Sequence, residues 1–314
     1  MKNLRYISDY TKFILMGHLL NPLWHDRLRR RKRRGYYNYR RVNRYLEPYL
    51  PFVKSLKLTG KKIADTDIRR DNKIFSIWFQ GEENAPRLVK ACFQRLRQFY
   101  GDRVVILDND TLWEWVTLPE YIKEKWERKK IVPANFSDIC RVALLHQHGG
   151  MWFDATDYLT SRVPQWIEDS DLFIYMEGGR ITPYTFIQSC FMRGVKGNEL
   201  LGGVLELIYE YWKKENKAVD YFLFHFLFRF LVENNEEAAE IFERMPKVNQ
   251  DPTHNLWFKY LTEPYSDETF RRATEGTFFQ KTTFKSKQAF HPNEGTIADY
   301  IINNKIKSGD ESVK

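Results

Sequence analysis

Cysteine is scarce in this chain of 314 residues, which contains only Cys92, Cys140 and Cys190. An odd number of cysteines with no close spacing argues against a disulfide framework and against a zinc site. We therefore expect the protein to work in a reducing, cytoplasmic compartment.

Long apolar runs are also missing. No segment approaches the roughly 20 apolar residues that span a bilayer. The run YFLFHFLFRFLV, residues 221–232, contains His225 and Arg229 and therefore predicts a buried helix. The apolar stretch near residues 13–20 is short and is followed by no small-residue cleavage site, so we expect no secretory signal.

The chain has no glycine-rich dinucleotide signature after its first predicted strand, where residues 78–84 read WFQGEEN. This argues against an NAD-binding enzyme. Internal repeats and low-complexity segments are lacking too. The length fits one large α/β domain with additions, or two small domains.

Positive charge is concentrated in one segment. Residues 1–50 hold 13 Lys/Arg against 3 Asp/Glu, whereas the remainder holds 37 against 38. The basic run at residues 27–34 follows a mildly amphipathic stretch, which suits an anionic membrane surface at about 1 kcal/mol per basic residue. A solvated or partner-bound extension is the alternative. No recognition motif accompanies the charge, so we expect no nucleic-acid partner.

From Ile74 onward, strand and helix patterns alternate. Predicted strands cover residues 74–79, 104–107, 151–153, 172–176 and 186–192, and predicted helices cover 85–100, parts of 111–130, 135–148, 198–215 and 218–245. Asn84 is the expected cap of the first of these helices. This order predicts an α/β fold with a Rossmann-like, mostly parallel sheet flanked by helices. Residues 1–70 form a basic, partly helical extension, and residues 292–314 a polar, loose tail.

The most specific stretch, residues 135–160, reads NFSDICRVALLHQHGGMWFDATDYLT. Asp138 and Arg141 are three apart and share one helix face. Ser137 is a candidate cap of this helix or a residue that lines the site. Gly149 and Gly150 end the helix.

Three oxygen-bearing side chains follow the buried strand 151–153, namely Asp154, Thr156 and Asp157. Ligands bind at the carboxyl ends of strands in open α/β sheets. Clustered oxygen ligands there suit Mg²⁺ or Mn²⁺ holding a diphosphate. An acidic loop that caps the next element is the alternative.

Four blocks carry a family resemblance. They are IFSIWFQGEENAPRLVKAC (residues 74–92), SDICR with HGGMWFDAT, DYFLFH (residues 220–225) and QKTTFK (residues 280–285). With them the chain resembles the bacterial capsular polysaccharide synthesis protein family. These proteins are GT-A-type glycosyltransferases, similar to the family 32 mannosyltransferases and, more distantly, to the clostridial glucosylating toxins.

The resemblance implies a GT-A domain over residues 71–291 with a nucleotide diphosphate sugar as donor substrate. Asp154 matches the first aspartate of the DxD motif, Thr156 replaces the second, and Asp157 is an extra carboxylate. Asp154 and Asp157 are therefore the expected ligands of Mn²⁺ or Mg²⁺. Such a metal would neutralise charge on the leaving diphosphate.

The resemblance also implies roles for other residues. Trp78 would stack on the base and Gln80 would bond the base or ribose. Asp138 and Arg141 would hold the sugar hydroxyls and, with Asp154, form the catalytic set. A core tryptophan and an intrahelical salt bridge are the alternatives.

Lys281 and Lys285 would supply positive charge to the diphosphate, together with Thr282 and Thr283 as hydroxyl donors, if their segment folds back over the site. A charged surface strand is equally consistent with the pattern. Further candidates for the acceptor side are Asp220, Glu177 and His225, although a lone histidine on an aromatic helix is more often a core residue.

The sequence thus predicts a metal-dependent hexosyltransferase, retaining as in the relatives, with no identifiable catalytic base. Its acceptor would be a growing, lipid-linked capsular or other cell-surface glycan at the inner face of the membrane. Two alternatives stay open. One is a glycosyltransferase with a soluble acceptor, and the other is a non-catalytic nucleotide-sugar-binding or scaffold protein of polysaccharide assembly.

Overall fold

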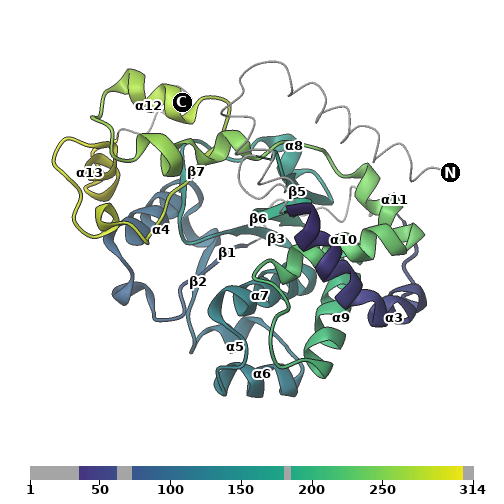
Figure 1. Ribbon diagram of the computed structural model, residues 1–314. Coiled ribbons are helices and arrows are strands. Elements are labelled where there is room, and N and C mark those ends of the chain that lie inside the picture. Colours follow the sequence, from purple (N-terminus) through teal and green to yellow (C-terminus); the bar gives the residue numbers. More distant parts are fainter. Residues whose placement is uncertain (1–34, 62–72, 180–184, 307–314) are drawn as a thin grey trace.

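A five-stranded sheet forms the centre of the computed structural model, which describes residues 35–61, 73–179 and 185–306 (Figure 1). The strand order is β2-β1-β3-β6-β5. The strands are β1 (Ile74–Ile77), β2 (Val104–Leu107), β3 (Gly150–Phe153), β5 (Leu172–Met176) and β6 (Ile187–Gly194). The basic run at residues 27–34, on which much of the predicted membrane contact depends, lies outside the described residues.

Four of these five strands run in the same direction. β1 pairs in parallel with β2 and with β3, whereas β6 is antiparallel to both β3 and β5. The predicted Rossmann-like, mostly parallel sheet is therefore confirmed.

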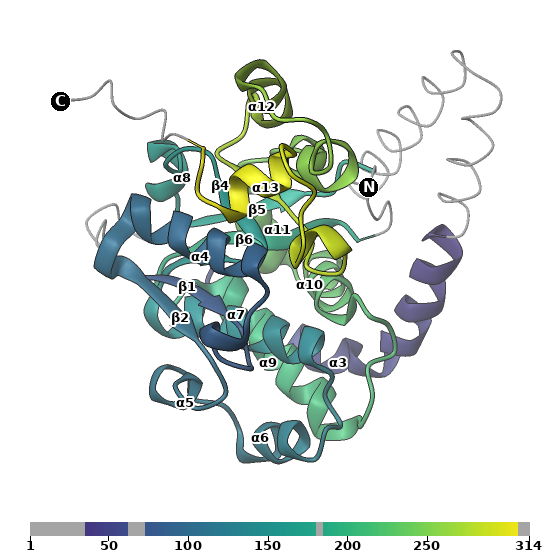
Figure 2. The ribbon, with the colours of Figure 1, turned by 90° about the vertical axis from the view of Figure 1, so that its left-hand side faces the viewer.

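Helices cover both faces of the sheet (Figures 1 and 2). The helices are α3 (Leu50–Ser55), α4 (Arg87–Tyr100), α5 (Leu112–Trp115), α6 (Glu120–Glu127), α7 (Pro133–His148), α8 (Gln165–Glu168), α9 (Glu199–Lys214), α10 (Leu223–Asn234), α11 (Glu236–Arg244), α12 (Asp267–Thr274) and α13 (Ile297–Ile302). α7, α9 and α10 lie on one side, and α4 with α13 lies on the other.

Alternate strand residues face the two helical layers, as the period of two in a strand requires. Phe75, Trp152 and Met192 join the cluster with α7, and Ile74 and Met151 join the cluster with α4. Burial on both faces explains why these strands are continuous apolar runs in the sequence.

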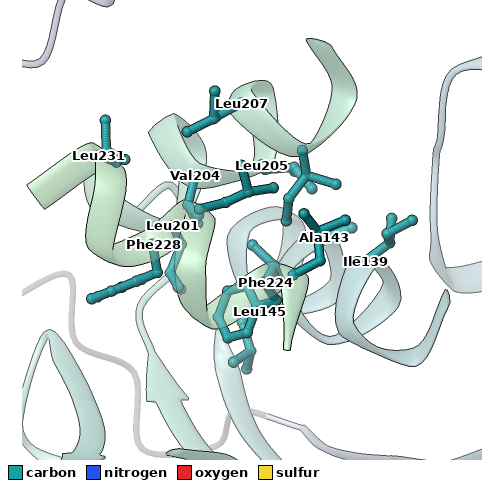
Figure 3. Close-up of a cluster of buried hydrophobic side chains, with 14 of the residues drawn as sticks. Ile139, Ala143, Leu145, Leu201, Val204, Leu205, Leu207, Phe224, Phe228 and Leu231 are labelled. Carbon is teal, nitrogen blue, oxygen red and sulfur yellow. The ribbon is translucent and has the colours of Figure 1, made fainter. Parts of the chain in front are cut away.

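Helix α7 is held by apolar contacts with α9 and α10 (Figure 3). The labelled side chains are Ile139, Ala143 and Leu145 of α7, Leu201, Val204, Leu205 and Leu207 of α9, and Phe224, Phe228 and Leu231 of α10. Each fully buried leucine or phenylalanine contributes roughly 1.5–3 kcal/mol. This layer keeps α7 in place against the sheet.

The turn between α7 and β3 admits only glycine. Gly149 has φ +71° and Gly150 has φ +112°. A Cβ at Gly150 would lie 2.1 Å from the Lys73 carbonyl oxygen, and one at Gly149 would lie 2.6 Å from the Lys196 backbone nitrogen. The predicted glycine turn is confirmed, and it sends the chain directly from α7 into β3.

The predicted Asn84 cap is wrong, and of the two roles left open for Ser137 the helix cap is the wrong one. α4 begins at Arg87 after Pro86, and the Asn84 side chain instead donates to the Gln80 carbonyl. α7 begins one turn before Ser137, at Pro133. Proline suits a first helical position because its φ is already helical and its missing N–H would have no partner there.

The two terminal segments are better packed than their composition suggested. Residues 35–46 are helical, and Val42 and Leu46 belong to the main core. The expectation of a loose tail is wrong for residues 297–302, because Ile297, Ala298 and Ile301 of α13 are buried in the cluster that includes Leu88 of α4. Their spacing places them on one helix face, which packs on α4. The last part of the predicted tail, residues 307–314, lies outside the described residues.

A second, two-stranded sheet was not predicted. It pairs β4 (Asp157–Leu159) with β7 (Phe279–Lys281) in antiparallel fashion. Both strands have only three residues, too short for a pattern to be recognised in the sequence. Over the described ranges, no helix is long and apolar enough to cross a membrane.

Candidate functional site

Five of the polar residues singled out in the sequence meet at the carboxyl edge of the parallel strands, namely Asp138, Arg141, Asp154, Asp157 and Lys281. β1 and β3 are neighbours, so Trp78 and Asp154, which follow them, lie at the same edge. The antiparallel strand β6 begins at this edge, where the Cys190 carbonyl oxygen accepts from the Asp154 backbone N–H at 2.8 Å. Ligands bind at such edges in open α/β sheets.

Asp154 is the centre of the site. Its Oδ1 accepts from Trp152 Nε1 at 2.9 Å and lies 3.2 Å from Arg141 Nη2. Its Oδ2 accepts from Lys281 Nζ at 2.5 Å. The side chain is 26% exposed, so a ligand can reach a carboxylate that two cations already hold in place.

The two terminal nitrogens of the Arg141 guanidinium are held by several partners, whereas its buried Nε has no hydrogen-bond partner among the described residues. The guanidinium donates to the Ser189 carbonyl at 2.8 Å and to Ser137 Oγ at 3.2 Å. It also lies 3.3 Å from Asp138 Oδ1 and 5.0 Å from the Trp152 ring. Because α7 and β6 both hold it, Arg141 presents a rigid positive charge at the sheet edge.

Lys281 reaches the site through the small sheet. The β4–β7 register places it opposite Asp157, whose Oδ1 lies 3.1 Å from Nζ. The Thr282 backbone N–H and hydroxyl both donate to the Thr156 carbonyl at 2.8 Å and extend this pairing. The Lys281 ammonium therefore bridges Asp154 and Asp157.

These contacts set the charge of the central pair. Burial alone would raise the pKa of Asp154, but the positive charges of Lys281 and Arg141 hold it below its ordinary value. Burial opposes the charge on Lys281 as well, and Asp154 with Asp157 nevertheless raises its pKa. Both groups are therefore ionised at neutral pH.

The two outer carboxylates behave differently. Burial raises the pKa of Asp138 to about 7, opposed by Arg141, and raises the pKa of Asp157 to about 7, opposed by Lys281. Each of these two carboxyl groups therefore gains or loses its proton near neutral pH, so the net charge of the cluster changes there.

Trp78 and Gln80 lie at the rim. Trp78 is half-buried, its ring centroid lies 5.2 Å from that of Phe284, and its buried Nε1 has no hydrogen-bond partner among the described residues. Gln80 is exposed. Lys285 is also exposed, with its ammonium 5.9 Å from the Phe284 ring, and forms none of the ion pairs of the central cluster.

The other candidates lie further out. His225 is buried, and burial followed by the charge of Arg141 lowers its pKa to about 3, which describes a neutral histidine in the core. Its Nε2 lies 3.3 Å from Ser189 Oγ. Asp220 pairs with Arg41 at 3.3 Å, and Glu177 accepts from the Gly179 N–H.

Two residues of the site were missed in the sequence. Ser189 lies in an apolar strand, and nothing in the pattern marks it as the partner of Arg141. Tyr221 precedes α10 and is 60% exposed. Desolvation and then the charges of Asp138 and Asp154 raise the pKa of its hydroxyl, so it lies within electrostatic reach of the cluster. Its place inside the DYFLFH block was the available signal.

The side chains fit a metal ion poorly as they are arranged. No group of three His, Cys, Asp or Glu side chains suited to a metal is gathered within the described part of the chain. A Mg²⁺ ion bound to both Asp154 Oδ2 and Asp157 Oδ1 would lie about 2.0–2.1 Å from each oxygen. Lys281 Nζ occupies that position, at 2.5 and 3.1 Å from the same two atoms.

The fold and the site define a Rossmann-like α/β protein with a cluster of buried carboxylates and cations at the edge of its sheet. Over residues 27–301 the chain matches the family model described as capsular polysaccharide synthesis protein. The match covers most of the chain, so the protein belongs to this family and has a role in capsule synthesis, as the four sequence blocks predicted. No curated protein and no solved structure matches it.

Proposed function

We propose that this protein is a GT-A-type glycosyltransferase that moves a hexose from a nucleotide diphosphate sugar to a growing capsular or other cell-surface glycan. The observation that supports it best is the arrangement of Arg141 and Lys281 around Asp154 at the carboxyl edge of β3. Two buried cations at an edge that binds ligands suit a diphosphate, and a partly exposed carboxylate between them suits sugar or ribose hydroxyls.

Trp78 would stack on the base of the nucleotide. Its ring is half-buried at the end of β1. Its Nε1, which has no partner among the described residues, would donate a hydrogen bond to a ligand oxygen. Asp138 and Arg141 would orient the hexose from the α7 side. The Asp154 carboxylate accepts two hydrogen bonds and has an ion pair with Arg141, so that of its roughly four acceptor positions at least one is left for a hydroxyl group.

The transfer would break the bond between the anomeric carbon and the phosphate oxygen, with the electron pair left on that oxygen. A new bond would form to the acceptor oxygen, whose proton would pass to the leaving phosphate. Arg141 and Lys281 would stabilise the charge that develops on the diphosphate, because they are already oriented before the reaction. Retention of the anomeric configuration is part of the proposal.

The acceptor would approach past Tyr221, whose exposed ring can stack on a sugar. Attachment to an anionic membrane surface through residues 1–50 would bring a lipid-linked acceptor close. The described end of this segment carries exposed Tyr36 and Tyr37 beside exposed Arg40, a combination that suits the lipid–water interface.

Donor hydrolysis by the full-length protein tests the function. A panel of UDP- and GDP-sugars is incubated with Mn²⁺, with Mg²⁺ and with EDTA, and release of the nucleoside diphosphate is measured. We expect cleavage of one donor, lost in Asp154→Asn. Absence of both cleavage and nucleotide binding would contradict the proposal.

A non-catalytic nucleotide-sugar-binding or scaffold protein is the second candidate. It is favoured by the replacement of a DxD carboxylate by Thr156 and by the occupation of Asp154 by two cations. Binding of donor and acceptor glycan together without any transfer would support this candidate. Transfer to soluble acceptors alone, unaffected by removal of residues 1–34, would instead indicate a soluble acceptor.

A further inference from the structure

Lys281 lies between the two carboxylates that the sequence assigned to a metal ion. Its Nζ is 2.5 Å from Asp154 Oδ2 and 3.1 Å from Asp157 Oδ1. The side chain is only 12% exposed, and the strand register fixes it opposite Asp157. The ammonium is therefore a built-in part of the site and not a mobile surface charge.

We propose that the Lys281 ammonium takes the place of a divalent cation, so that the protein binds the diphosphate of its donor without Mn²⁺ or Mg²⁺. The inference rests on the proposed function, because it concerns the donor diphosphate. Under this inference, a side chain of the site performs the task of the metal ion that the sequence led us to expect.

The hydrogen-bonding capacity of Lys281 supports this role. An ammonium group has three N–H donors. Asp154 Oδ2 accepts from one of them, and Asp157 Oδ1 lies 3.1 Å from Nζ as an ion-pair partner without a hydrogen bond among the described residues. Even if a second N–H is reserved for Asp157, the third has no acceptor among these residues. The remaining N–H is available for a phosphate oxygen. Arg141, whose Nη2 lies 3.2 Å from Asp154 Oδ1, adds a second permanent positive charge.

Position 156 contributes a backbone carbonyl and no carboxylate to this part of the site. Thr156 is buried, and its carbonyl oxygen accepts from both the backbone N–H and the hydroxyl of Thr282. This position is therefore used for pairing with the segment that carries Lys281. A negative ligand has been lost and a positive group gained at the same place, which lowers the attraction for a metal ion.

During transfer, the electron pair of the breaking bond stays on the leaving phosphate oxygen, and the ammonium stabilises it without giving up its proton. A divalent ion would perform the same electrostatic task as a Lewis acid. Two cations cannot share the space between Asp154 and Asp157, so one of them carries out this task.

Calorimetric titration of nucleoside diphosphates into the full-length wild-type protein is the first test. Uridine, guanosine, cytidine and adenosine diphosphates are each titrated in EDTA and in Mn²⁺. We expect the preferred nucleotide to bind with affinities that agree within about threefold in the two buffers. A loss of more than about tenfold in EDTA overturns the inference and leaves the proposed function standing. No binding of any nucleotide in either buffer overturns both.

A second measurement uses the metal alone. Mn²⁺ is titrated into the protein without nucleotide, and the signal of the unbound ion is followed by electron paramagnetic resonance. We expect no stoichiometric binding. One tightly bound Mn²⁺ per chain, lost in Asp154→Asn, overturns the inference.

Lys281 variants sharpen the result. In Lys281→Ala we expect nucleotide affinity in EDTA to fall about 10- to 100-fold, the loss of one charge-assisted contact. Mn²⁺ should restore part of it, because Asp154 and Asp157 then face an open position. Lys281→Arg should retain binding in EDTA, and Lys213→Ala, on the exposed surface of α9, is the matched control. Wild-type affinity of a folded Lys281→Ala in EDTA overturns the inference. The wild-type titration decides the question if this variant does not fold.

Discussion

The two sides of α7 show how one helix serves two purposes. Ile139 and Ala143 pack on α9 and α10, where shape and volume matter (Figure 3). The guanidinium of Arg141 instead pairs with Asp138 and with Asp154 at the edge of the sheet. Buried ion pairs contribute little net stability, whereas apolar burial contributes much. We therefore expect the apolar side to determine folding and the charged side to determine function.

The largest effect should come from the apolar side. Phe228→Ala removes a fully buried ring from α10 and should lower the free energy of unfolding by about 3–5 kcal/mol. Chemical denaturation measures the loss. Nucleotide affinity per folded molecule should be unchanged, and an equal loss of affinity would contradict the division between the two sides.

Asp154→Asn should have the largest effect on turnover. The amide keeps the shape but removes the charge between Arg141 and Lys281, so we expect donor cleavage to fall about 100- to 1,000-fold. Steady-state kinetics with the preferred donor measures this. Activity within a few fold of wild type would show that Asp154 has a purely structural role.

Arg141→Lys should weaken donor binding while keeping the charge. A lysine cannot contact Ser137, Ser189 and Asp154 together, so we expect nucleotide-sugar affinity to fall about tenfold. Calorimetry gives the affinity, and a melting curve serves as the folding control. Unchanged affinity would indicate that the guanidinium only supports the fold.

Asp138 should make stability depend on pH. Its pKa is about 7 in the folded chain against 3.8 as the ordinary value, so the folded state binds more protons between these limits. Its contribution to stability therefore falls as pH rises through this window, by at most about 1.4 kcal/mol per unit, and levels off above pH 7. The free energies of unfolding of Asp138→Asn and of the wild type are measured at pH 5 and pH 7. From pH 5 to pH 7 the variant should become more stable relative to the wild type. A constant difference would contradict the assigned pKa.

The smallest effect should come from an exposed ion pair. Arg41 is 55% exposed where it meets Asp220. Arg41→Ala should cost less than about 1 kcal/mol in unfolding free energy, because solvent screens such pairs. Attachment to anionic vesicles is the informative readout. A clear loss of vesicle binding with unchanged stability would indicate that the helix of residues 35–46, which includes Arg41, lies on the membrane surface.

Local patterns predicted most of the fold. The strand β5 was predicted at residues 172–176 as observed, and α9 within one residue at each end, because apolar spacing reports burial directly. The tail helix α13 was missed because its apolar face has only three buried residues in a polar surrounding. The helix starts were missed because each lies beside a proline, Pro86 before α4 and Pro133 at the start of α7, and neither start has a side-chain cap.

The sequence by itself determined the features that depend on near neighbours. Helical spacing puts Asp138 and Arg141 on one face, and the Gly149–Gly150 turn follows from backbone angles open only to glycine. Only the tertiary structure decided that Lys281 meets Asp154, 127 residues away in the chain, and that Ser189 holds Arg141. Such contacts depend on strand register and on the packing of distant elements. A local pattern records that a residue is charged, but the fold determines which charge it meets.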